Sequence, residues 1–258
     1  MKAIRGTLRL IAVIVILVVM YSAYLIKIIF VKHTLESGFK LRRNFVCRTI
    51  RILGIQVETL GTPKKEKPAL YVINHRSLVD PVIISAYIDA FFVSKAEVSS
   101  YPVLGAGAQK TGVIFVKRDS QSSRSATLDA IKETFLRKEN IGIFPEGTTN
   151  LYRLTKQYRL GSIKLAAEMN IPIIPVVLEY RDHKDLWNMN NMFAQFIKQF
   201  GPRKTYTKLL IGEEITGGSG IEILQKVQSF TDQTLHEMHE NWSTMNFEGE
   251  REPLAVEN

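Results

Sequence analysis

The sequence predicts an α/β fold: a mainly parallel sheet of about seven strands covered by helices, preceded by an apolar helix and a basic amphipathic helix. Three observations predict it. Short apolar runs alternate with helical patterns from Gly54 onward, which is typical of parallel sheets. The length of 258 residues suits one α/β domain with an appended segment. Residues 1–60 hold ten Lys and Arg against two Glu, so most of the net charge of +9 precedes the folded body.

The composition excludes several classes of protein. Hydrophobic residues make up 45% and charged residues 23%, ordinary values that exclude a wholly disordered chain. Cys47 is the single cysteine, which excludes an intramolecular disulfide and a CxxC zinc site, and a reducing compartment is expected. The body after residue 60 is nearly neutral, whereas a DNA-binding domain normally carries basic charge on its fold. We therefore expect no metal and no nucleic-acid partner.

Residues 1–34 are predicted to be a membrane-anchoring helix. Leu10 to Ile26 is a run of 17 residues without a charge. As a helix it reaches about 26 Å, against a bilayer core of about 30 Å, so both spanning the bilayer and embedding in one leaflet stay open. The alternative is a cleaved signal peptide, but the run exceeds the usual ~7–15 residues and no A-x-A site follows. The basic residues that follow place the rest of the chain on the cytosolic side.

Residues 35–53 are predicted to form a basic amphipathic helix on the membrane surface. The apolar half of its helical wheel holds Leu35, Phe39, Leu41, Phe45, Val46, Ile50, Ile52 and Leu53, and the other half holds Lys40, Arg43, Arg48 and Arg51. Arg42 intrudes on the apolar side. Such a helix suits the headgroup plane of an anionic membrane. The alternative is a helix that packs on its own domain with a solvated basic face, and both can hold along different parts of its length.

Residues 54–245 are predicted to be one folded domain. The expected strands are 55–60, 69–74, 90–94, 112–116, 141–144, 173–180 and 208–212. The expected helices are 81–88, 122–137, 161–169, 185–200 and 221–242. Residues 246–258 hold four Glu and are predicted to be a disordered acidic tail.

Two short patterns are rejected as functional motifs. Residues 105–111 look like a phosphate-binding loop, but Gln109 stands where such a loop needs Gly before Lys110. His236 and His239 are one residue too close for the HExxH zinc motif and lie in a charged helix, so we expect solvated side chains at both.

The strongest chemical pattern begins where the second predicted strand ends. Residues 74–81 read Asn-His-Arg-Ser-Leu-Val-Asp-Pro, and ligands of open α/β sheets bind at the carboxyl ends of strands. His75 would emerge there as a group that titrates near neutral pH and accepts a proton. Asp80 could reach one imidazole nitrogen through a turn and fix the tautomer. The alternative for Asp80 is to cap a helix whose first residue is Pro81, and both roles can coexist.

A second strand end carries Phe-Pro-Glu-Gly-Thr at residues 144–148. Gly147 permits a positive φ, so the turn could gather backbone N–H groups around an anion. Taken alone, the pattern is more typical of an ordinary strand-exit turn.

Four ordered blocks together resemble the lysophospholipid and glycerolipid acyltransferase family, of the bacterial 1-acylglycerol-3-phosphate acyltransferase type. They are NHxxxxD at 74–80, Gly-Val-Ile-Phe-Val-Lys-Arg at 112–118, Phe-Pro-Glu-Gly-Thr at 144–148 and Ile-Pro-Ile-Ile-Pro at 171–175. One block can occur by chance, but four in order are a specific signal. The resemblance extends over residues 35–215.

The resemblance implies acyl transfer from an acyl thioester to the hydroxyl of a lysophospholipid, with 1-acylglycerol-3-phosphate as the first expected acceptor and phosphatidic acid as product. It implies that His75 is the general base and that Asp80 orients it. The residues implied to contact the acceptor's phosphate region are Arg118, Glu146, Gly147 and Thr148, with Lys95 as a secondary candidate. Pro172 and Pro175 would shape the acyl side, and residues 54–245 would be the catalytic domain.

One position departs from the family pattern. Relatives commonly read FPEGTR, whereas Thr149 occupies the last position here. Arg153, Lys156 or Arg159 could compensate, or the acceptor could be another lysolipid or a lyso-aminolipid. Lys95 has the alternative of being a surface lysine at a strand end.

The resemblance implies no cofactor, since acyl-CoA or acyl-acyl-carrier-protein would act as co-substrate. The expected partners are a membrane lipid acceptor and an anionic membrane surface, and the expected location is the cell membrane with the catalytic domain on its cytosolic face. Two other functions are kept. One is a catalytically silent membrane-surface lipid-binding protein, against which the intact pair of His75 and Asp80 argues. The other is a hydrolase, which would release fatty acid without an acceptor.

Overall fold

A seven-stranded sheet forms the centre of the protein, with strand order β1-β7-β6-β2-β5-β3-β4. The computed structural model describes residues 1–61, 68–101, 103–116, 121–189 and 191–242. Its strands are β1 (Ile55–Leu60), β2 (Leu70–Ile73), β3 (Phe91–Lys95), β4 (Val113–Val116), β5 (Ile141–Ile143), β6 (Ile173–Tyr180) and β7 (Thr205–Ile211). Every pair is parallel except β6 with β7, so the predicted fold class is confirmed.

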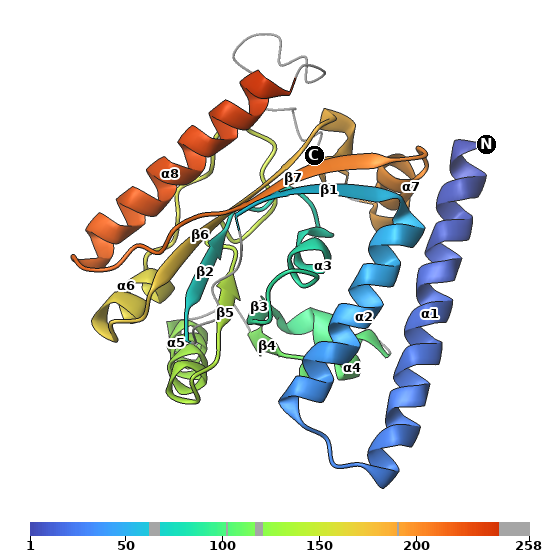
Figure 1. Ribbon diagram of the computed structural model, residues 1–258, viewed down its shortest axis with the longest axis horizontal. Coiled ribbons are helices and arrows are strands. Elements are labelled where there is room, and N and C mark those ends of the chain that lie inside the picture. The colour runs from blue at the N-terminus through green and yellow to red at the C-terminus, as the bar shows by residue number, and fades with distance from the viewer. Residues whose placement is uncertain (62–67, 102, 117–120, 190, 243–258) are drawn as a thin grey trace.

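Helices cover both faces of the sheet (Figure 1). They are α1 (Lys2–Phe30), α2 (Leu35–Leu53), α3 (Asp80–Ile84), α4 (Leu104–Lys110), α5 (Gln121–Leu136), α6 (Gly161–Glu168), α7 (Met192–Phe200) and α8 (Gly220–Asn241), with 3₁₀ turns η1 (Ala96–Ser100) and η2 (His183–Asp185). Side chains of β2 alternate between the two layers, as a pleated strand requires. Tyr71 and Ile73 pack with α3 and α7, whereas Leu70 and Val72 pack with α5, α6 and α8.

The central strands bring two of the sequence blocks together. β2 is fully buried and pairs in parallel with both β5 and β6. Because parallel strands end at the same edge of a sheet, residues 74–80 after β2 lie beside residues 144–149 after β5. The carboxyl edge of the sheet therefore holds the first and third blocks.

Four elements differ from those expected by three residues or more. Helix α3 ends at Ile84, whereas the prediction extended it to residue 88. β7 begins at Thr205, earlier than predicted, because its parallel pairing with β1 starts where Thr205 faces Ile55. The helix predicted over 185–200 begins at Met192, where the Asn191 side chain accepts from Ala194 N–H as a cap. Helix α4 was not predicted, and it contains most of the segment that resembled a phosphate loop.

Helix α1 packs against the rest of the protein near both of its ends. Arg9 donates to the carbonyl oxygen of Phe200, the last residue of α7, at 2.7 Å, and to that of Pro202, just after the helix, at 2.6 Å. Gly6 permits this contact, because a Cβ there would lie 2.8 Å from Ile197 Cδ1. Near the other end, Tyr24 is buried and its hydroxyl bonds the His33 ring. Both ends of α1 are thus fastened by polar contacts.

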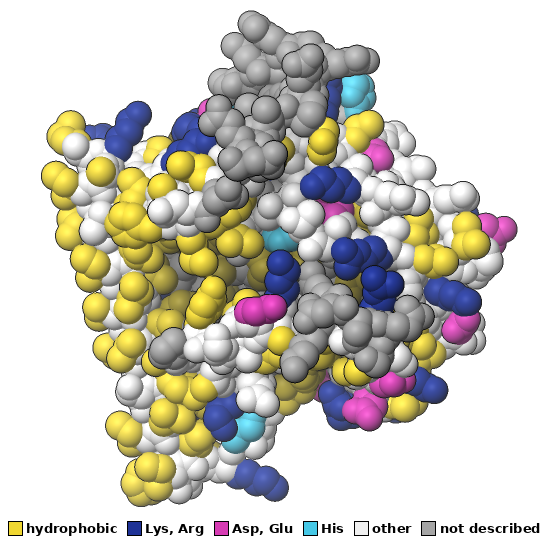
Figure 2. All heavy atoms as spheres, turned by 180° about the vertical axis from the view of Figure 1, so that it is seen from behind, with side chains coloured by type: hydrophobic (Ala, Val, Ile, Leu, Met, Phe, Trp, Pro, Cys, Tyr) yellow, Lys and Arg dark blue, Asp and Glu magenta, His cyan; other side chains and the backbone are white. Residues whose placement is uncertain are grey.

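The outer face of α1 is apolar and exposed. Its exposed large hydrophobic residues are Ile4, Leu8, Ile11, Ile14, Val15, Val18, Val19, Leu25, Ile26, Ile29 and Phe30. Figure 2 shows hydrophobic side chains gathered along this edge of the molecule. Of the helices in the described part of the chain, α1 is the one whose length and composition suit a membrane crossing.

Helix α2 has the predicted bounds and packs one face on the domain. A capping box of Thr34 and Ser37 starts the helix, and Gly54 in the left-handed region ends it. Arg42 is buried and donates to the carbonyl oxygens of Ala90 and Thr111. The four basic residues of the predicted polar face, Lys40, Arg43, Arg48 and Arg51, are exposed. One face of α2 therefore packs on its own domain, and the membrane-surface role of the exposed basic face stays a prediction.

Candidate active site

The structure brings His75 and Asp80 together in the loop between β2 and α3. His75 Nδ1 lies 2.8 Å from Asp80 Oδ2. Because a carboxylate oxygen accepts, Nδ1 carries the proton and Nε2 keeps its lone pair. The His75 side chain is 13% exposed, whereas that of Asp80 is fully buried. Nε2 can therefore take a proton while Asp80 stabilises the resulting imidazolium.

Three further donors hold the carboxylate of Asp80. Oδ2 accepts from the N–H groups of Arg76 and Ser77 at 2.6 and 2.8 Å. Oδ1 accepts from the Tyr180 hydroxyl at 2.6 Å. These bonds compensate for burying the charge. The predicted helix-capping role of Asp80 is wrong, since Val79 is the N-cap residue of α3 and has no side-chain cap bond.

The turn after β5 holds the backbone of His75. Glu146 accepts from His75 N–H through Oε1 and from Lys156 N–H through Oε2, both at 2.9 Å. Asn150 N–H donates to the His75 carbonyl at 2.7 Å. Burial raises the pKa of Glu146, although the two N–H donors counteract it. Glu146 thus positions the backbone of His75, and its predicted contact with the acceptor's phosphate region stays a prediction.

A buried ionic cluster ties the end of β2 to α8. Glu179 Oε2 lies 2.8 Å from an Arg76 guanidinium nitrogen and 3.0 Å from His239 Nε2. Burial alone would raise the pKa of Glu179, but Arg76 and His239 outweigh it, so the pKa lies below its ordinary value. The prediction of a solvated His239 is wrong, because that side chain is 1% exposed, whereas His236 is 52% exposed.

Arg76 also fixes the segment that follows the β5 turn. Its guanidinium donates to the carbonyl oxygens of Asn150 at 3.3 Å, of Tyr152, and of Arg153 at 2.9 Å. Both residues near the start of the loop 74–80 are therefore held in place. The turn after β5 holds His75, and β6 together with the 150–153 segment holds Arg76.

A cavity of about 1170 Å³ lies at the carboxyl ends of β3, β4 and β5; Phe144 is among its lining residues, whereas His75 and Asp80 are not. Its apolar lining consists of Val93, Val116, Leu128, Ile143, Phe144, Pro145 and Leu160. Phe144 connects the cavity to the pair, because its ring centroid lies 4.4 Å from that of His75. The Phe144 ring thus lies between the apolar lining of the cavity and the imidazole.

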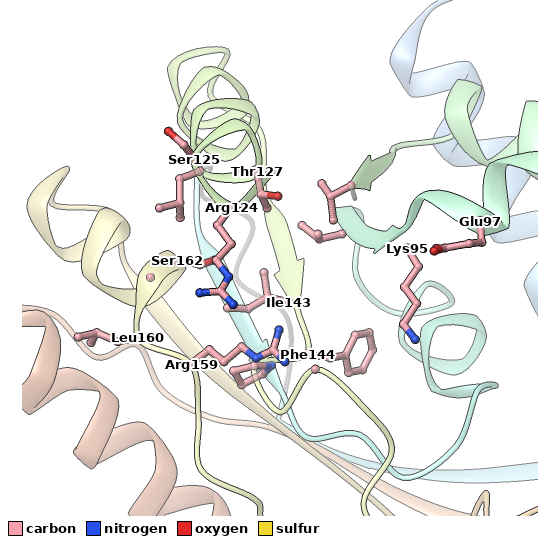
Figure 3. A pocket seen from close by; sticks show the side chains of 16 residues that line it. Lys95, Glu97, Arg124, Ser125, Thr127, Ile143, Phe144, Arg159, Leu160 and Ser162 are labelled. Atoms are coloured by element: carbon pink, nitrogen blue, oxygen red, sulfur yellow. The ribbon is translucent and has the colours of Figure 1, made fainter. Parts of the chain in front are cut away.

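Three cationic side chains line the same cavity: Lys95, Arg124 and Arg159. In Figure 3, Arg124 from α5 and Arg159 from the segment before α6 extend into a common space, and Lys95 lies on the side of β3. The Arg159 guanidinium lies against Gly147, where a Cβ would come within 2.7 Å of Cζ. Neither arginine forms an ion pair with another described residue. Glu97 also lines the cavity, so three cationic side chains face one carboxylate, and the arrangement can still attract an anion.

The residues of the third block are only partly arranged as expected. Gly147 has the predicted positive φ of 77° and lines the cavity. Its N–H donates to the Phe144 carbonyl at 3.0 Å, so this N–H is already used within the turn. Thr148 is exposed but is not one of the lining residues. Arg118, the arginine of the second block, lies outside the described residues.

The two prolines of the fourth block lie in the sheet. The Pro172 carbonyl accepts from Leu70 N–H at 2.9 Å, at the amino end of β6. Pro175 faces Val72 across the strand pair. Neither lines the cavity, and their role on the acyl side stays a prediction.

Sequence reasoning missed Tyr180, Glu179 and Arg124. The first two end a strand that is buried at every position, and a Glu closing such a run is a signal, because buried carboxylates are almost always paired. Arg124 lies on a helix whose sequence carries no such signal. In the described part of the chain, no group of three His, Cys, Asp or Glu side chains is placed to hold a metal ion; the absence of a cofactor stays a prediction.

Comparison with known proteins fits this arrangement. The family model named Acyltransferase matches residues 54–179. A lyso-ornithine lipid O-acyltransferase of Pseudomonas aeruginosa is 30% identical over 190 residues, which cover 74% of this chain and 70% of that protein. A 1-acyl-sn-glycerol-3-phosphate acyltransferase of Neisseria gonorrhoeae is 30% identical over 132 residues, half of this chain and 51% of that protein.

A solved structure shares the fold. The 1-acyl-sn-glycerophosphate acyltransferase PlsC from Thermotoga maritima superposes with a TM-score of 0.74 at 20% sequence identity, covering 94% of this chain and all of that one. The ordered blocks, the buried carboxylate beside the histidine and these relatives lead to one conclusion: the chain belongs to the lysophospholipid acyltransferase family and is an acyltransferase.

Proposed function

We propose that the protein transfers an acyl group from an acyl thioester to the hydroxyl of an anionic lysolipid, with 1-acylglycerol-3-phosphate as the first candidate acceptor. The observation that carries this proposal is the hydrogen-bonded pair of His75 and Asp80, which the Phe144 ring connects to a cavity with both apolar and cationic lining residues. Apolar lining suits an acyl chain, and the cationic residues suit a phosphate.

The chemistry follows from the geometry of the pair. His75 Nε2 takes the proton of the acceptor hydroxyl as its oxygen attacks the thioester carbonyl. The new C–O bond forms, the C–S bond breaks, and the imidazolium returns the proton to the leaving thiolate. Asp80, held by four donors, stabilises the imidazolium between these two steps. A base of this kind contributes roughly 10²–10⁴-fold in rate.

The headgroup would bind at the cationic wall of the cavity. Of the three residues that could replace the family's missing arginine at Thr149, Arg159 alone lines the cavity. Lys156 Nζ donates to the Thr149 carbonyl at 3.3 Å, and the Arg153 guanidinium lies 3.3 Å from His236 Nδ1. Arg159, Arg124 and Lys95 therefore supply the described cationic groups of the cavity, and Arg118 remains a further candidate. An anchored headgroup holds the hydroxyl near the base.

A lyso-aminolipid is the second candidate acceptor. It is favoured by the relatives named lyso-ornithine lipid O-acyltransferase, of which those from Pseudomonas aeruginosa and Brucella abortus match over 70% and 68% of their own length. The Neisseria relative named for the glycerophosphate acceptor matches over 51%. A guanidinium fork binds both phosphate and carboxylate, so the cavity alone permits both acceptors.

An acceptor panel tests the proposal. The full-length protein in detergent micelles receives one acyl-CoA and, in parallel, 1-acylglycerol-3-phosphate, lyso-ornithine lipid, 1-acylglycerol or no acceptor. Transfer to the first with a kcat/KM well above the others supports the proposal, and preference for the second supports the alternative. Release of fatty acid in the arm without acceptor would instead identify a hydrolase. Repeating the panel with an acyl-acyl-carrier-protein identifies the donor.

Arg159→Gln is expected to raise the KM for 1-acylglycerol-3-phosphate by about tenfold or more, since a charge-assisted phosphate contact is lost. The KM for the acyl donor and for uncharged 1-acylglycerol should change little. The matched control is Lys164→Gln, an exposed cation on α6 that does not line the cavity. An equal rise for charged and uncharged acceptors would contradict a headgroup role for Arg159.

We further propose that α1 lies embedded in one leaflet of the cell membrane, with the catalytic domain on the cytosolic face. Arg9 bonds carbonyl oxygens at the end of α7, and the Tyr21 ring lies against Gly107 of α4, which disfavours a helix that crosses the bilayer away from the domain. The outer face is left for lipid (Figure 2). The exposed basic residues of α2 would meet anionic headgroups.

Substituting Val15 and Val19 with Glu is expected to lower co-sedimentation with anionic liposomes at least tenfold, because a carboxylate in hydrocarbon costs roughly 2 kcal/mol or more. Both residues are more than half exposed, so the fold should tolerate the change. Ile221→Glu on α8, at 59% exposure, is the matched control and should bind as the unmodified protein does. Undiminished binding of the double variant would show that another surface carries the attachment.

A further inference from the structure

The hydroxyl of Tyr180 is the one described donor to Asp80 Oδ1. The other oxygen, Oδ2, accepts from His75 Nδ1 and from two backbone N–H groups, whereas Oδ1 accepts from Tyr180 at 2.6 Å. Tyr180 and Asp80 are both completely buried, so water cannot replace this bond. Tyr180 thus holds the oxygen of Asp80 that the motif residues leave without a described donor.

The end of β6 is built to hold this tyrosine in place. The amide of Asn74, immediately before His75, exchanges two hydrogen bonds with the backbone of Leu178, at 2.9 and 2.8 Å. Glu179, the next residue, pairs with Arg76 on the far side of His75. Three consecutive residues of β6, Leu178 to Tyr180, therefore bond three residues of the segment 74–80. Tyr180 is the one that bonds the pair of His75 and Asp80, through Asp80.

We propose that Tyr180 is a positioning residue for acyl transfer: its phenolic hydroxyl orients Asp80 and withdraws part of the carboxylate's charge, which tunes the readiness of His75 to accept a proton. The inference rests on the proposed base mechanism. It adds a third member, supplied by a strand that begins about 100 residues further along the chain, to the pair that the sequence motif defines.

Tyr180 can act as a donor over the whole working pH range. Burial, followed by the negative charge of Asp80, raises the pKa of Tyr180 well above its ordinary value, so the phenol keeps its proton. The bond therefore always runs from the hydroxyl to the carboxylate. A donor to a carboxylate stabilises its charged form and weakens its pull on the neighbouring imidazolium.

Several other titratable groups surround the pair. Glu146 accepts from the His75 backbone, the cluster of Arg76, Glu179 and His239 lies beside it, and Asp185 interacts with Tyr180 from η2. Burial raises the pKa of Asp185 to about 7, so this carboxyl titrates within the range of the assay. Asp185→Asn is therefore needed as a background in which that titration is absent.

The decisive variant is Tyr180→Phe, which removes one oxygen atom. We expect kcat to fall about tenfold with an almost unchanged KM for both substrates, because a bond to a charged group is lost without loss of binding surface. The acid limb of the kcat/KM–pH profile should move up by about half to one pH unit. Without the donor from residue 180, the Asp80 carboxylate attracts the His75 imidazolium more strongly, so the imidazolium loses its proton at a higher pH. The same shift should occur in the Asp185→Asn background.

A second variant should shift the acid limb in the opposite direction. Site-specific 3,5-difluorotyrosine at position 180 keeps the hydroxyl and makes it a stronger donor, so the acid limb should move down. Tyr71→Phe is the matched control, since it removes a hydroxyl from another buried tyrosine of the same core cluster, whereas the described donors to Asp80 are His75, Arg76, Ser77 and Tyr180. It should leave the pH profile unchanged even where urea unfolding shows a similar loss of stability.

The outcomes separate this inference from the proposed function. If the unmodified protein acylates no acceptor in the panel, the proposed function fails. If the unmodified protein is active and Tyr180→Phe keeps both its kcat and its acid limb, the role of Tyr180 is overturned. A fall in kcat without a shifted limb, matched by Tyr71→Phe, would also overturn it, because that result describes packing alone. If Tyr180→Phe fails to fold, the sign of the difluorotyrosine shift decides.

Discussion

His75→Ala should lower kcat by at least ~100-fold while the protein stays folded. The imidazole is partly exposed and its ring has one hydrogen bond, to Asp80. Removing the imidazole should therefore lower kcat much more than it lowers the free energy of unfolding. The measurement is single-acceptor turnover with 1-acylglycerol-3-phosphate, paired with circular dichroism and a urea unfolding curve to confirm the fold.

Two comparisons make this result specific. His236→Ala removes a histidine that is 52% exposed on α8, and turnover should remain normal. Asp80→Asn keeps the volume of the side chain but weakens the stabilisation of the imidazolium, so kcat should also fall strongly. A folded His75→Ala protein with near-normal turnover would contradict the base mechanism and would leave the cavity as a lipid-binding site only.

The largest expected effect on stability belongs to Arg76→Met. The Arg76 and Glu179 side chains are 1% and 2% exposed, and the guanidinium also serves three backbone carbonyls. Removing one partner of a buried pair typically costs about 3–5 kcal/mol, because the remaining charge is buried without its counterion. Urea unfolding should therefore show a large drop in the free energy of unfolding.

An exposed ion pair serves as the control for Arg76→Met, and a double variant tests the role of the remaining charge. Lys164 and Glu168 on α6 lie 3.8 Å apart with side chains 60% exposed, so Lys164→Met should cost no more than about 1 kcal/mol. The double variant Arg76→Met with Glu179→Gln should recover part of the loss, because no uncompensated carboxylate remains. A drop for Arg76→Met no larger than for Lys164→Met would show that the buried pair contributes little.

Local patterns predicted many of the elements correctly. β1 and β6 have the predicted bounds, since Gly54 and Gly61 flank the first strand and Pro172 and Arg181 flank the second. Helix α2 also has the predicted bounds, because Gly54 in the left-handed region ends it. In each case the residues that determine the element lie within it or directly beside it.

Elements that depend on distant partners were predicted less well. Helix α4 contains two glycines, which disfavour a helix by about 1 kcal/mol each, yet it forms where Gly105 packs on the Ser99 backbone and Gly107 on the Tyr21 ring. The segment before α7 is not helical, because the side chain of Gln195 accepts from the N–H groups of Asn188 and Met189. Neither contact can be inferred from local periodicity.

The site shows the same division. By itself, the sequence determined the acyltransferase family and singled out His75 and Asp80 as candidate site residues. These two residues lie in one short segment, and their spacing forms the NHxxxxD motif. Only the tertiary structure decided that Glu146 holds the backbone of His75, that His239 is buried against Glu179, and that Arg159 faces the cavity. It also decided that Tyr180, 100 positions from Asp80 in the chain, donates to that carboxylate. The physical reason is that a hydrogen bond or ion pair requires atoms within about 3–4 Å, and the order of strands in the sheet, rather than the order of residues in the chain, brings those atoms together.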